Sequence, residues 1–377
     1  MRVLHAYKVF RPDIDGGIVS VIALACSAGD PDISSRILVA RGRLGLAQQY
    51  DFDQIKGRAV ASMGTLLGMP IAPGFPMALA LASRQADVVV LHHPFPFNDI
   101  GAMGIPDRVG LVVHWHSEIH GRRLFARGLE PFLRRTLDRA DRIIVSNEAI
   151  LENSTLLLSH RAKCEVVPFG VDPTKWTSAN DAQRARAHDL RQQHPRLVAA
   201  LGRLVPYKGF GVLIRAIAQI DAHLIIIGTG KQRKSLEMLA ARLGVSDRVT
   251  LTGYLHNDEV KARLLAARVF AFPSVTDAET FGISQLEAMA VGLPIVNTRL
   301  KTAVPYVARD GIEAITVPPG DPQALAAALT RLLDDEGLAK RLGAAGQVRV
   351  GGEFEAARFV TRVQTIYRDV YEATRKR

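Results

Sequence analysis

The loop Gly202–Gly209 carries the residue types that could bind a phosphorylated ligand. Arg203 and Lys208 lie five positions apart in it, directly after a short apolar run. A guanidinium can hold a diphosphate through two parallel hydrogen bonds, and an ammonium adds a point charge. Cations also occur on ordinary surface loops, so the spacing alone leaves both interpretations open.

Two glutamates form a second candidate group. Glu279 precedes a predicted helix over Ile283–Ala290, and Glu287 lies inside that helix on a face of otherwise small and apolar residues. A carboxylate in such surroundings is costly unless it has a hydrogen-bonding partner. A sugar hydroxyl would be a suitable partner, and a nearby arginine is the alternative. Gly282, at the start of the helix, lets the backbone approach a ligand closely.

A pair of glycines near the N-terminus forms the third candidate. Gly16 and Gly17 stand between a predicted strand and a helix that runs to about residue 28. Paired glycines allow close approach of the backbone, and a helix N-terminus offers free N–H groups to a phosphate. An ordinary tight turn has the same composition, so the motif alone is weak.

Signatures of metal and redox cofactors are absent or incomplete. The turn Gly228–Gly230 lacks the third glycine of a dinucleotide fingerprint, which disfavours a nicotinamide-dependent oxidoreductase. The segments 13–15 and 51–53 match a short D-x-D metal-binding pattern, but neither follows a strong buried strand, and we interpret them as surface acids. Cys26 and Cys164 are too few to form a zinc site or a disulfide framework. We therefore expect no metal and no cofactor.

The elements that must position these residues are short apolar runs alternating with helix-length segments. Runs without polar alternation suit parallel strands buried on both faces, so the pattern predicts doubly wound α/β architecture. Ligands of such sheets bind beyond the carboxyl ends of the strands. The predicted strands are 3–6, 37–40, 88–92, 110–114, 143–146 and 165–168 in the first half, and 197–201, 223–227, 249–251, 269–273, 294–297 and 314–317 in the second.

The length of 377 residues predicts two domains. We place one Rossmann-like domain at 1–178 and another at 179–354, facing each other across an interdomain cleft. Segment 172–195 is the linker and leading helix between them, and 355–377 is an amphipathic helix that packs back on the body. With 48% hydrophobic and 23% charged residues, no run of about 18 apolar residues and no signal-peptide core, we expect a cytoplasmic protein.

Taken together, the motifs resemble the retaining nucleotide-sugar transferases of glycosyltransferase family 4. The resemblance lies in E-x7-E from Glu279 to Glu287, G-R-x4-K-G at 202–209 and the Gly-Gly loop, in the expected order over nearly the whole chain. It implies the GT-B fold, with the donor held mainly by the C-terminal domain and the acceptor by the N-terminal one. It also implies a reaction without metal.

The resemblance assigns roles residue by residue. Arg203 and Lys208 would bind the donor diphosphate and stabilise its departure, Glu279 would lie beside the donor sugar, and Glu287 would bind the ribose hydroxyls. The backbone near the start of the helix would contact the sugar or phosphate, the Gly-Gly loop the β-phosphate, and the segment 253–255 the base. The residues concerned are Phe281, Gly282, Ile283, Gly16, Gly17 and Tyr254.

The segment Val113–Ile119 resembles the H-W-H-S-D-I segment of GDP-mannose-dependent α-mannosyltransferases of exopolysaccharide assembly, with Glu118 in place of Asp. It implies that His116 lies at the cleft near the donor sugar. We expect transfer of mannose from GDP-mannose to a glycan or lipid-linked oligosaccharide in bacterial polysaccharide or lipopolysaccharide biosynthesis. A UDP-sugar (glucose, GlcNAc or galactose) is the alternative donor, and a nucleotide-sugar 2-epimerase or a non-catalytic basic binder is more remote. His114 and His120 also suit ordinary strand-end or surface positions.

The stretch 122–142 is rich in arginine, and the whole chain carries a net charge of +11. With Pro131 in its first turn, this stretch predicts a basic amphipathic helix that could contact an anionic membrane peripherally, on the inner face. The alternative is a solvated helix whose apolar side faces the core. Few aromatics interleave with the cations, which argues against a nucleic-acid partner. The apolar side comprises Phe132, Leu133, Leu137 and Ala140, and the arginines are Arg122, Arg123, Arg127, Arg134, Arg135, Arg139 and Arg142.

Overall fold

The computed structural model describes residues 1–14, 16–27, 30–52, 55–66, 68–117 and 123–376, without the side chains of 50 and 123–127. It divides into two compact units, Met1–Phe169 with Ala356–Arg377, and Gly170–Glu355. The predictions that concern Asp15, Asp53, Glu118, His120 and Arg122 lie outside the described residues.

The first unit is built on an eight-stranded sheet in the order β10-β9-β8-β7-β1-β2-β4-β3. Its strands pair in parallel except for β3, which is antiparallel to β4. The strands are β1 (Arg2–Tyr7), β2 (Ser34–Ala40), β3 (Gln48–Phe52), β4 (Ile55–Val60), β7 (Val88–His93), β8 (Gly110–Trp115), β9 (Arg142–Val145) and β10 (Cys164–Val166), with a separate hairpin of β5 (Thr65–Leu66) and β6 (Met69–Pro70).

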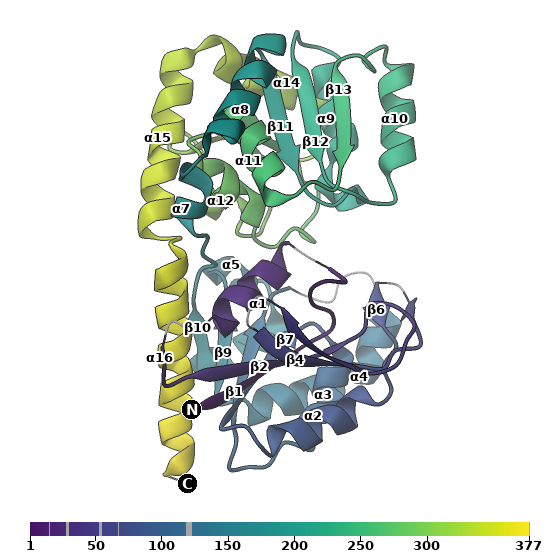
Figure 1. The fold of residues 1–377 in the computed structure, drawn as a ribbon, viewed down its shortest axis with the longest axis vertical. Coiled ribbons are helices and arrows are strands. Elements are labelled where there is room, and N and C mark those ends of the chain that lie inside the picture. Colours follow the sequence, from purple (N-terminus) through teal and green to yellow (C-terminus); the bar gives the residue numbers. More distant parts are fainter. Residues whose placement is uncertain (15, 28–29, 53–54, 67, 118–122, 377) are drawn as a thin grey trace. The chain divides into compact units, whose positions relative to one another are not determined.

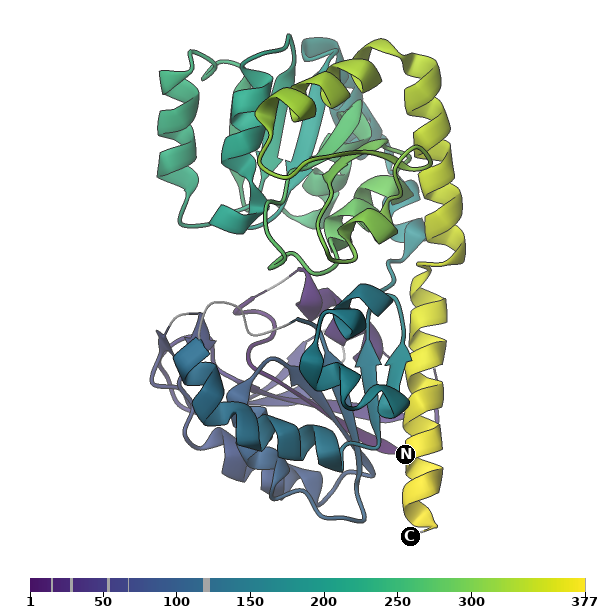
Figure 2. The same cartoon turned by 180° about the vertical axis from the view of Figure 1, so that it is seen from behind.

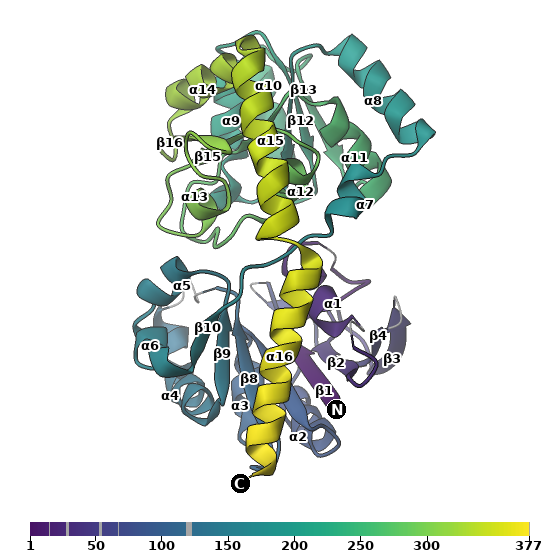
Figure 3. The ribbon, with the colours of Figure 1, turned by 90° about the vertical axis from the view of Figure 1, so that its left-hand side faces the viewer.

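Helices cover both faces of this sheet. Figures 1 and 2 show α2, α3 and α4 against one face, and Figure 3 shows α1 and α16 against the other. In agreement, α16 contacts α1, β7 and β8. The helices are α1 (Ile18–Cys26), α2 (Phe75–Ser83), α3 (Pro96–Ala102), α4 (Arg123–Arg139), α5 (Glu148–Glu152), α6 (Thr155–Leu158), the 3-10 turn η1 (Arg161–Lys163) and α16 (Ala356–Arg375).

The second unit has a wholly parallel sheet in the order β13-β12-β11-β14-β15-β16. The chain winds outward in opposite directions from β11 and β14, so these neighbouring strands form the topological switch point where ligands of such sheets bind. The strands are β11 (Leu197–Leu201), β12 (His223–Ile227), β13 (Val249–Gly253), β14 (Val269–Phe272), β15 (Ile295–Thr298) and β16 (Ala314–Val317).

The helices of the second unit enclose an aliphatic core on the faces of this sheet, in which Val198, Leu224 and Val296 are fully buried. This burial on both faces explains why the strands read as continuous apolar runs. The helices are α7 (Pro173–Thr177), α8 (Asp181–Gln193), the 3-10 turn η2 (Pro206–Lys208), α9 (Phe210–Ile217), α10 (Arg233–Arg242), α11 (Asn257–Ala266), α12 (Ile283–Ala290), α13 (Val304–Val307), α14 (Pro322–Asp334) and α15 (Glu336–Gly352).

The two α/β units with parallel sheets confirm the predicted fold class, but three details differ from the predictions. The second unit starts at Gly170, before the predicted boundary at 178, because α7, capped by Asp172, packs against α12 of that unit. Strands β3 and β4 were not predicted, since neither is a continuous apolar run: β3 is a largely polar edge strand, and β4 beside it carries the exposed Lys56 and Arg58. Pro131 lies inside α4 rather than in its first turn.

Candidate functional site

The loops that follow β11, β12 and β14 pack backbone against backbone at the switch point of the second unit. Gly209 has φ +68°, and a Cβ there would lie 1.9 Å from the carbonyl oxygen of Pro273. A Cβ on Gly228 would lie 2.0 Å from the carbonyl oxygen of Gly202. Only glycine fits at such approaches. The G-R-x4-K-G motif is therefore held tightly against the segment that carries Glu279.

Lys208 and Glu279 form an ion pair at this point. The Lys208 Nζ and the Glu279 Oε2 are 2.5 Å apart, and the two side chains are 13% and 10% exposed. The Ser274 hydroxyl donates a hydrogen bond to the same carboxylate oxygen at 3.0 Å, and the ammonium lies 5.0 Å from the centre of the Phe272 ring. Two residues predicted separately thus share one nearly dry position at the carboxyl ends of β11 and β14.

Arg203 differs from Lys208 in its exposure. Its side chain is exposed, and its Nη2 donates to the Tyr207 hydroxyl at 3.4 Å, at the long limit for a hydrogen bond. The motif therefore presents one cation fixed in an ion pair and one cation at the surface. A polyanionic ligand would meet the exposed guanidinium first.

Helix α12 begins at the same edge of the sheet. Gly282 precedes it with φ +87°, and a Cβ there would lie 2.9 Å from the Phe272 ring. Phe281 is buried, Ile283 and Glu287 are half-buried, and the Ser284 hydroxyl is buried without a hydrogen-bond partner among the described residues. The first turn of the helix offers N–H groups to an anion. The two glutamates lie before this turn and within the helix.

A buried amide network fixes α12 on the sheet. The Asn297 Nδ2 donates to the Gln285 Oε1 at 2.9 Å, and the Gln285 Nε2 donates to the Val304 carbonyl at 3.3 Å. The sequence motifs did not include Gln285, Asn297 and Ser274. A signal for Asn297 was present, since it is a polar residue inside the apolar run 294–297. Ser274 carries no such signal, because its role depends on a contact with Glu279.

The glycine pair belongs to the first unit. Gly16 and Gly17 have φ of +80° and +54°, and Gly17 caps the N-terminus of α1 after β1. A Cβ at either position would meet no atom within 4 Å, so the requirement for glycine is conformational rather than steric. The N–H groups of the first turn of α1 are placed at the carboxyl end of β1.

His116 belongs to the first unit, and Tyr254 belongs to the second. His116 follows β8 in the first unit and is 2% exposed, with its Nε2 2.9 Å from the Nδ1 of His92. Burial lowers the pKa of His116 well below its usual value, so the ring is neutral at physiological pH. Tyr254 follows β13 at the edge of the second sheet and is 69% exposed.

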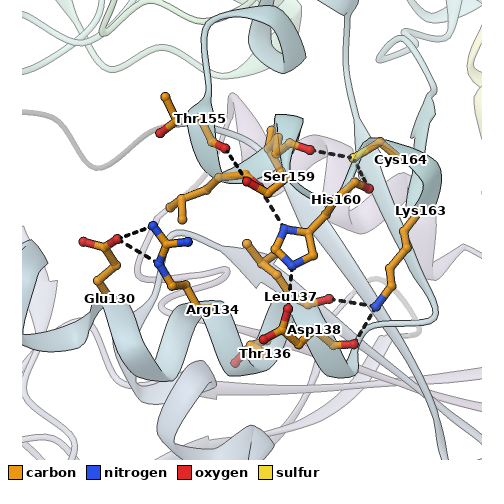
Figure 4. Close-up of polar contacts among 12 residues, drawn as sticks. Glu130, Arg134, Thr136, Leu137, Asp138, Thr155, Ser159, His160, Lys163 and Cys164 are labelled. Atoms are coloured by element: carbon orange, nitrogen blue, oxygen red, sulfur yellow. Dashed lines mark hydrogen bonds and ion pairs between the residues drawn. The ribbon is translucent and has the colours of Figure 1, made fainter.

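The arginine-rich helix α4 directs its apolar side into the first unit, where Leu133 and Leu137 are buried. Figure 4 shows the ion pair of Arg134 with Glu130, at 2.6 Å, and the hydrogen bonds that hold the end of the helix. There the Lys163 ammonium donates to the carbonyls of Leu137 and Asp138. Over the side chains of α4 that the structure describes, 128–139, these contacts support a solvated helix whose apolar side packs on the core. Within the described residues, no helix has the length and apolar character needed to cross a bilayer.

Comparison with known proteins matches both halves of the chain to families. Residues 181–349 match the family described as "Glycosyl transferases group 1", and residues 16–175 match "Glycosyltransferase Family 4". The chain is 28% identical to the D-rhamnosyltransferase WbpZ of Pseudomonas aeruginosa, over 94% of this chain and 93% of that protein. It is 25% identical to the O-antigen chain mannosyltransferase C of Escherichia coli, over 99% and 100%.

The alignment with a third relative covers about half of that protein. It is a GDP-mannose-dependent phosphatidylinositol monomannoside mannosyltransferase of Mycolicibacterium smegmatis, 36% identical over 49% of this chain and 51% of that protein. Among solved structures, a sucrose-phosphate synthase from Thermosynechococcus elongatus superposes with a TM-score of 0.81 at 20% identity, covering 99% of both chains. Anabaena Alr3699/HepE in complex with UDP-glucose superposes with a TM-score of 0.77 at 19% identity, covering 98% and 100%.

Proposed function

Because the chain belongs to glycosyltransferase family 4 and has the GT-B fold, we propose that it transfers mannose from GDP-mannose with retention of configuration. In this proposal the acceptor is a glycan or lipid-linked oligosaccharide of bacterial polysaccharide or lipopolysaccharide biosynthesis. The names of two relatives support the sugar, since one is an O-antigen chain mannosyltransferase and the other is GDP-mannose-dependent.

The observation that carries the proposal is the ion pair of Lys208 and Glu279 at the switch point. Cleavage of a nucleotide-sugar bond builds negative charge on the departing diphosphate. A fixed cation in a nearly dry position stabilises that charge more strongly than one in water, and it needs no rearrangement during the reaction. Exposed Arg203 would add a bidentate contact to the same diphosphate.

The other groups complete the donor site in this proposal. Glu287 accepts hydrogen bonds from the ribose hydroxyls, the backbone at 281–283 contacts the sugar or phosphate, and Gly16 and Gly17 bring the first turn of α1 to the β-phosphate. The Tyr254 region contacts the base, and His116 contacts the donor sugar. The acceptor attacks on the face that the diphosphate leaves, and we assign no covalent nucleophile. Arg203 and Lys208 supply the charge stabilisation without a metal.

Calorimetric titration tests the donor. We would titrate the protein, without divalent metal, with GDP-mannose, UDP-glucose, UDP-GlcNAc and the free nucleotides GDP and UDP. GDP-mannose should bind more tightly than either UDP-sugar. Glu287→Ala should weaken binding of GDP by about tenfold or more, the usual worth of hydrogen bonds to a charged group. Glu237→Ala, in a surface ion pair with Arg233, is the matched control. Failure of the folded protein to bind any nucleotide sugar would contradict the proposal.

A UDP-sugar donor is the second candidate. One solved structure with this fold is a complex with UDP-glucose. Preference for UDP over GDP in the titration would keep the site and replace the donor. A nucleotide-sugar 2-epimerase is more remote, and it would convert the donor to its epimer in the absence of any acceptor.

A further inference from the structure

Four histidines line one face of the first unit's sheet, beneath α16. His5 lies on β1, His92 on β7, and His114 and His116 at the end of β8; all four are buried. The His5 ring meets Tyr367 of α16 edge-on at 5.8 Å, and the His114 ring lies 6.2 Å from Phe359 of the same helix. Three neighbouring strands thus bring imidazoles together from positions far apart in the sequence.

Three of these rings form a linear chain. The His5 Nδ1 lies 3.1 Å from the His92 Nε2, and the His92 Nδ1 lies 2.9 Å from the His116 Nε2. The ring centres are 5.4 Å and 5.2 Å apart, and the planes of the last two rings are parallel within 1°. In both pairs, the distance between the ring centres exceeds the N···N distance by little more than two ring radii. The facing nitrogens therefore lie on the line that joins the ring centres. This is the geometry of two N–H···N hydrogen bonds.

A metal ion is the alternative reading of the cluster, because ring nitrogens of His92, His114 and His116 lie within 4.8 Å of one another. Zinc holds imidazole nitrogens tetrahedrally at about 2.0–2.1 Å, so the lone pairs must converge on one centre. In the pair of His92 and His116 the nitrogens face each other directly at 2.9 Å. The collinear arrangement therefore favours hydrogen bonds over chelation.

Two hydrogen bonds in series constrain all three protons. A neutral imidazole has one N–H donor and one acceptor nitrogen. His92 uses both of its nitrogens, so if it donates from Nδ1 it must accept at Nε2. Both contacts are then made only when His5, His92 and His116 all carry the proton on Nδ1, or all on Nε2. Burial keeps the rings neutral, since it lowers the pKa of His5 to about 3 and that of the other two well below the usual value.

The two ends of the chain decide between these states. The His5 Nε2 and the His116 Nδ1 have no hydrogen-bond partner within the described part of the chain. The all-Nε2 state leaves an unpaired N–H at His5, in the middle of a buried strand, which is costly. The all-Nδ1 state moves that N–H to His116, whose Nδ1 is also buried but lies after the carboxyl end of β8, at the end of a parallel sheet where ligands bind.

We infer that His5 and His92 are positioning residues that fix His116 in the Nδ1–H form, so that His116 offers a hydrogen-bond donor to an oxygen of the bound ligand. That this oxygen belongs to a sugar rests on the proposed function. The coupling of the three tautomers does not, because it follows from the contacts among the three rings.

Nuclear magnetic resonance measures the tautomers directly. We would label the full-length protein with ¹⁵N-histidine and record two-bond ¹H–¹⁵N correlation spectra at neutral pH without ligand, with single histidine substitutions for assignment. His5, His92 and His116 should all show the Nδ1–H pattern. An Nε2–H pattern, an imidazolium or a metal-bound nitrogen at any of the three would overturn the inference.

The variant His5→Leu tests whether the far end of the chain controls His116. It removes the donor to the His92 Nε2, so His92 and His116 should become mixtures of the two tautomers. His5→Asn, whose amide can donate near the same position, should restore the Nδ1–H form. His93→Leu is the matched control. His93 neighbours His92 in sequence, but it lies on the opposite face of the sheet, where its Nε2 is 3.5 Å from the Asp99 Oδ1.

If His116 keeps the pure Nδ1–H tautomer in folded His5→Leu protein, the inference is overturned. If His5→Leu does not fold, the wild-type spectrum alone decides. The spectra need no nucleotide sugar, so failure of the proposed function and failure of the inference about the three histidines are separate results. Failure of the proposed function would appear only in the donor titration, and failure of the inference would appear only in the tautomers measured by nuclear magnetic resonance.

Discussion

At the residue scale, Lys208 and Glu279 each limit what the other can do. The ammonium neutralises the carboxylate, and the Ser274 hydroxyl supplies a further hydrogen bond to it. The same ammonium must contact the leaving diphosphate in the proposed reaction. A bound donor would therefore compete with Glu279 for Lys208, and the pair keeps the cation in place until the donor arrives.

Substitution of both partners separates stability from catalysis. Lys208→Met should lower the free energy of unfolding by about 3 kcal/mol, because it leaves a buried carboxylate unpaired. The double variant Lys208→Met with Glu279→Gln should regain most of that loss, yet both variants should be about 100-fold slower, since the diphosphate loses its fixed cation. Urea unfolding and initial rates measure the two effects. Lys234→Met, at an exposed position, is the control; recovery of activity in the double variant would contradict the assignment.

At the element scale, the close approach of loops determines where glycine is required. Gly209 and Gly244 both have φ +68°, but a Cβ on Gly209 would meet the Pro273 carbonyl whereas a Cβ on Gly244 would meet nothing within 4 Å. The two positions thus share the cost of left-handed backbone and differ only in available space. They form a matched pair.

Alanine at each position should give different losses of stability. Gly244→Ala should cost about 1 kcal/mol, the strain of an L residue at this φ. Gly209→Ala should cost about 1–3 kcal/mol more, because the loop after β11 must move away from β14, and it should also reduce donor binding. Chemical denaturation and calorimetry measure these changes. Equal losses in the two variants would show that the loops are not packed as described.

The buried histidines give the first unit a distinct dependence on pH. Burial lowers the pKa values of His5, His93 and His114 to about 3, and those of His92 and His116 also fall. The unfolded chain binds more protons between pH 6.5 and 3, so stability should fall as the pH falls through this range. Burial raises the pKa of Asp99 to about 8, so the contribution of this carboxyl to stability changes with pH in the opposite direction. One carboxyl acts against five imidazoles. With these pKa values the two effects balance, and stability should peak, near about pH 7.

Tryptophan fluorescence tests this dependence in each unit separately. Trp115 lies in the first unit and Trp176 in the second. In Trp176→Phe protein the urea midpoint reported by Trp115 should fall from pH 6.5 to pH 5. In Trp115→Phe protein the midpoint reported by Trp176 should change less. A first unit equally stable at both pH values would contradict the neutral, buried state of the histidines.

At the scale of the whole molecule, the net charge of +11 favours anionic partners. Because the described apolar side chains of α4 pack into the core, contact of this part of the helix with a membrane would be electrostatic. Arg134→Glu with Arg135→Glu should weaken binding to vesicles containing phosphatidylglycerol by about tenfold or more, and salt should weaken wild-type binding. Arg184→Glu with Arg186→Glu, on exposed positions of α8, is the matched control. Equal losses in a sedimentation assay would show a general charge effect and contradict a specific contact through α4.

The sequence allowed the twelve main strands to be predicted because parallel strands buried on both faces need continuous apolar runs. Strands β3 and β4 were missed because neither is such a run: β3 is the edge strand, and β4 beside it carries the exposed Lys56 and Arg58. Arg203, Lys208 and Glu287 were found as motifs, but the pairing of Lys208 with Glu279 depends on two loops that meet only in the folded unit. The histidine chain was hidden for the same reason, since His5, His92 and His116 come from three strands, and only His116 carried a motif.

The return of α16 to the first unit has a consequence for synthesis on the ribosome. The second unit is one continuous segment, 170–355, and all of it emerges before α16 does. The histidine face of the first sheet lacks its contacts with α16 during that time, because Phe359 and Tyr367 have not yet been translated. Translation of the first unit therefore begins before that of the second unit but ends after it. Helix α16 can pack over the buried histidines only once the second unit has been synthesised.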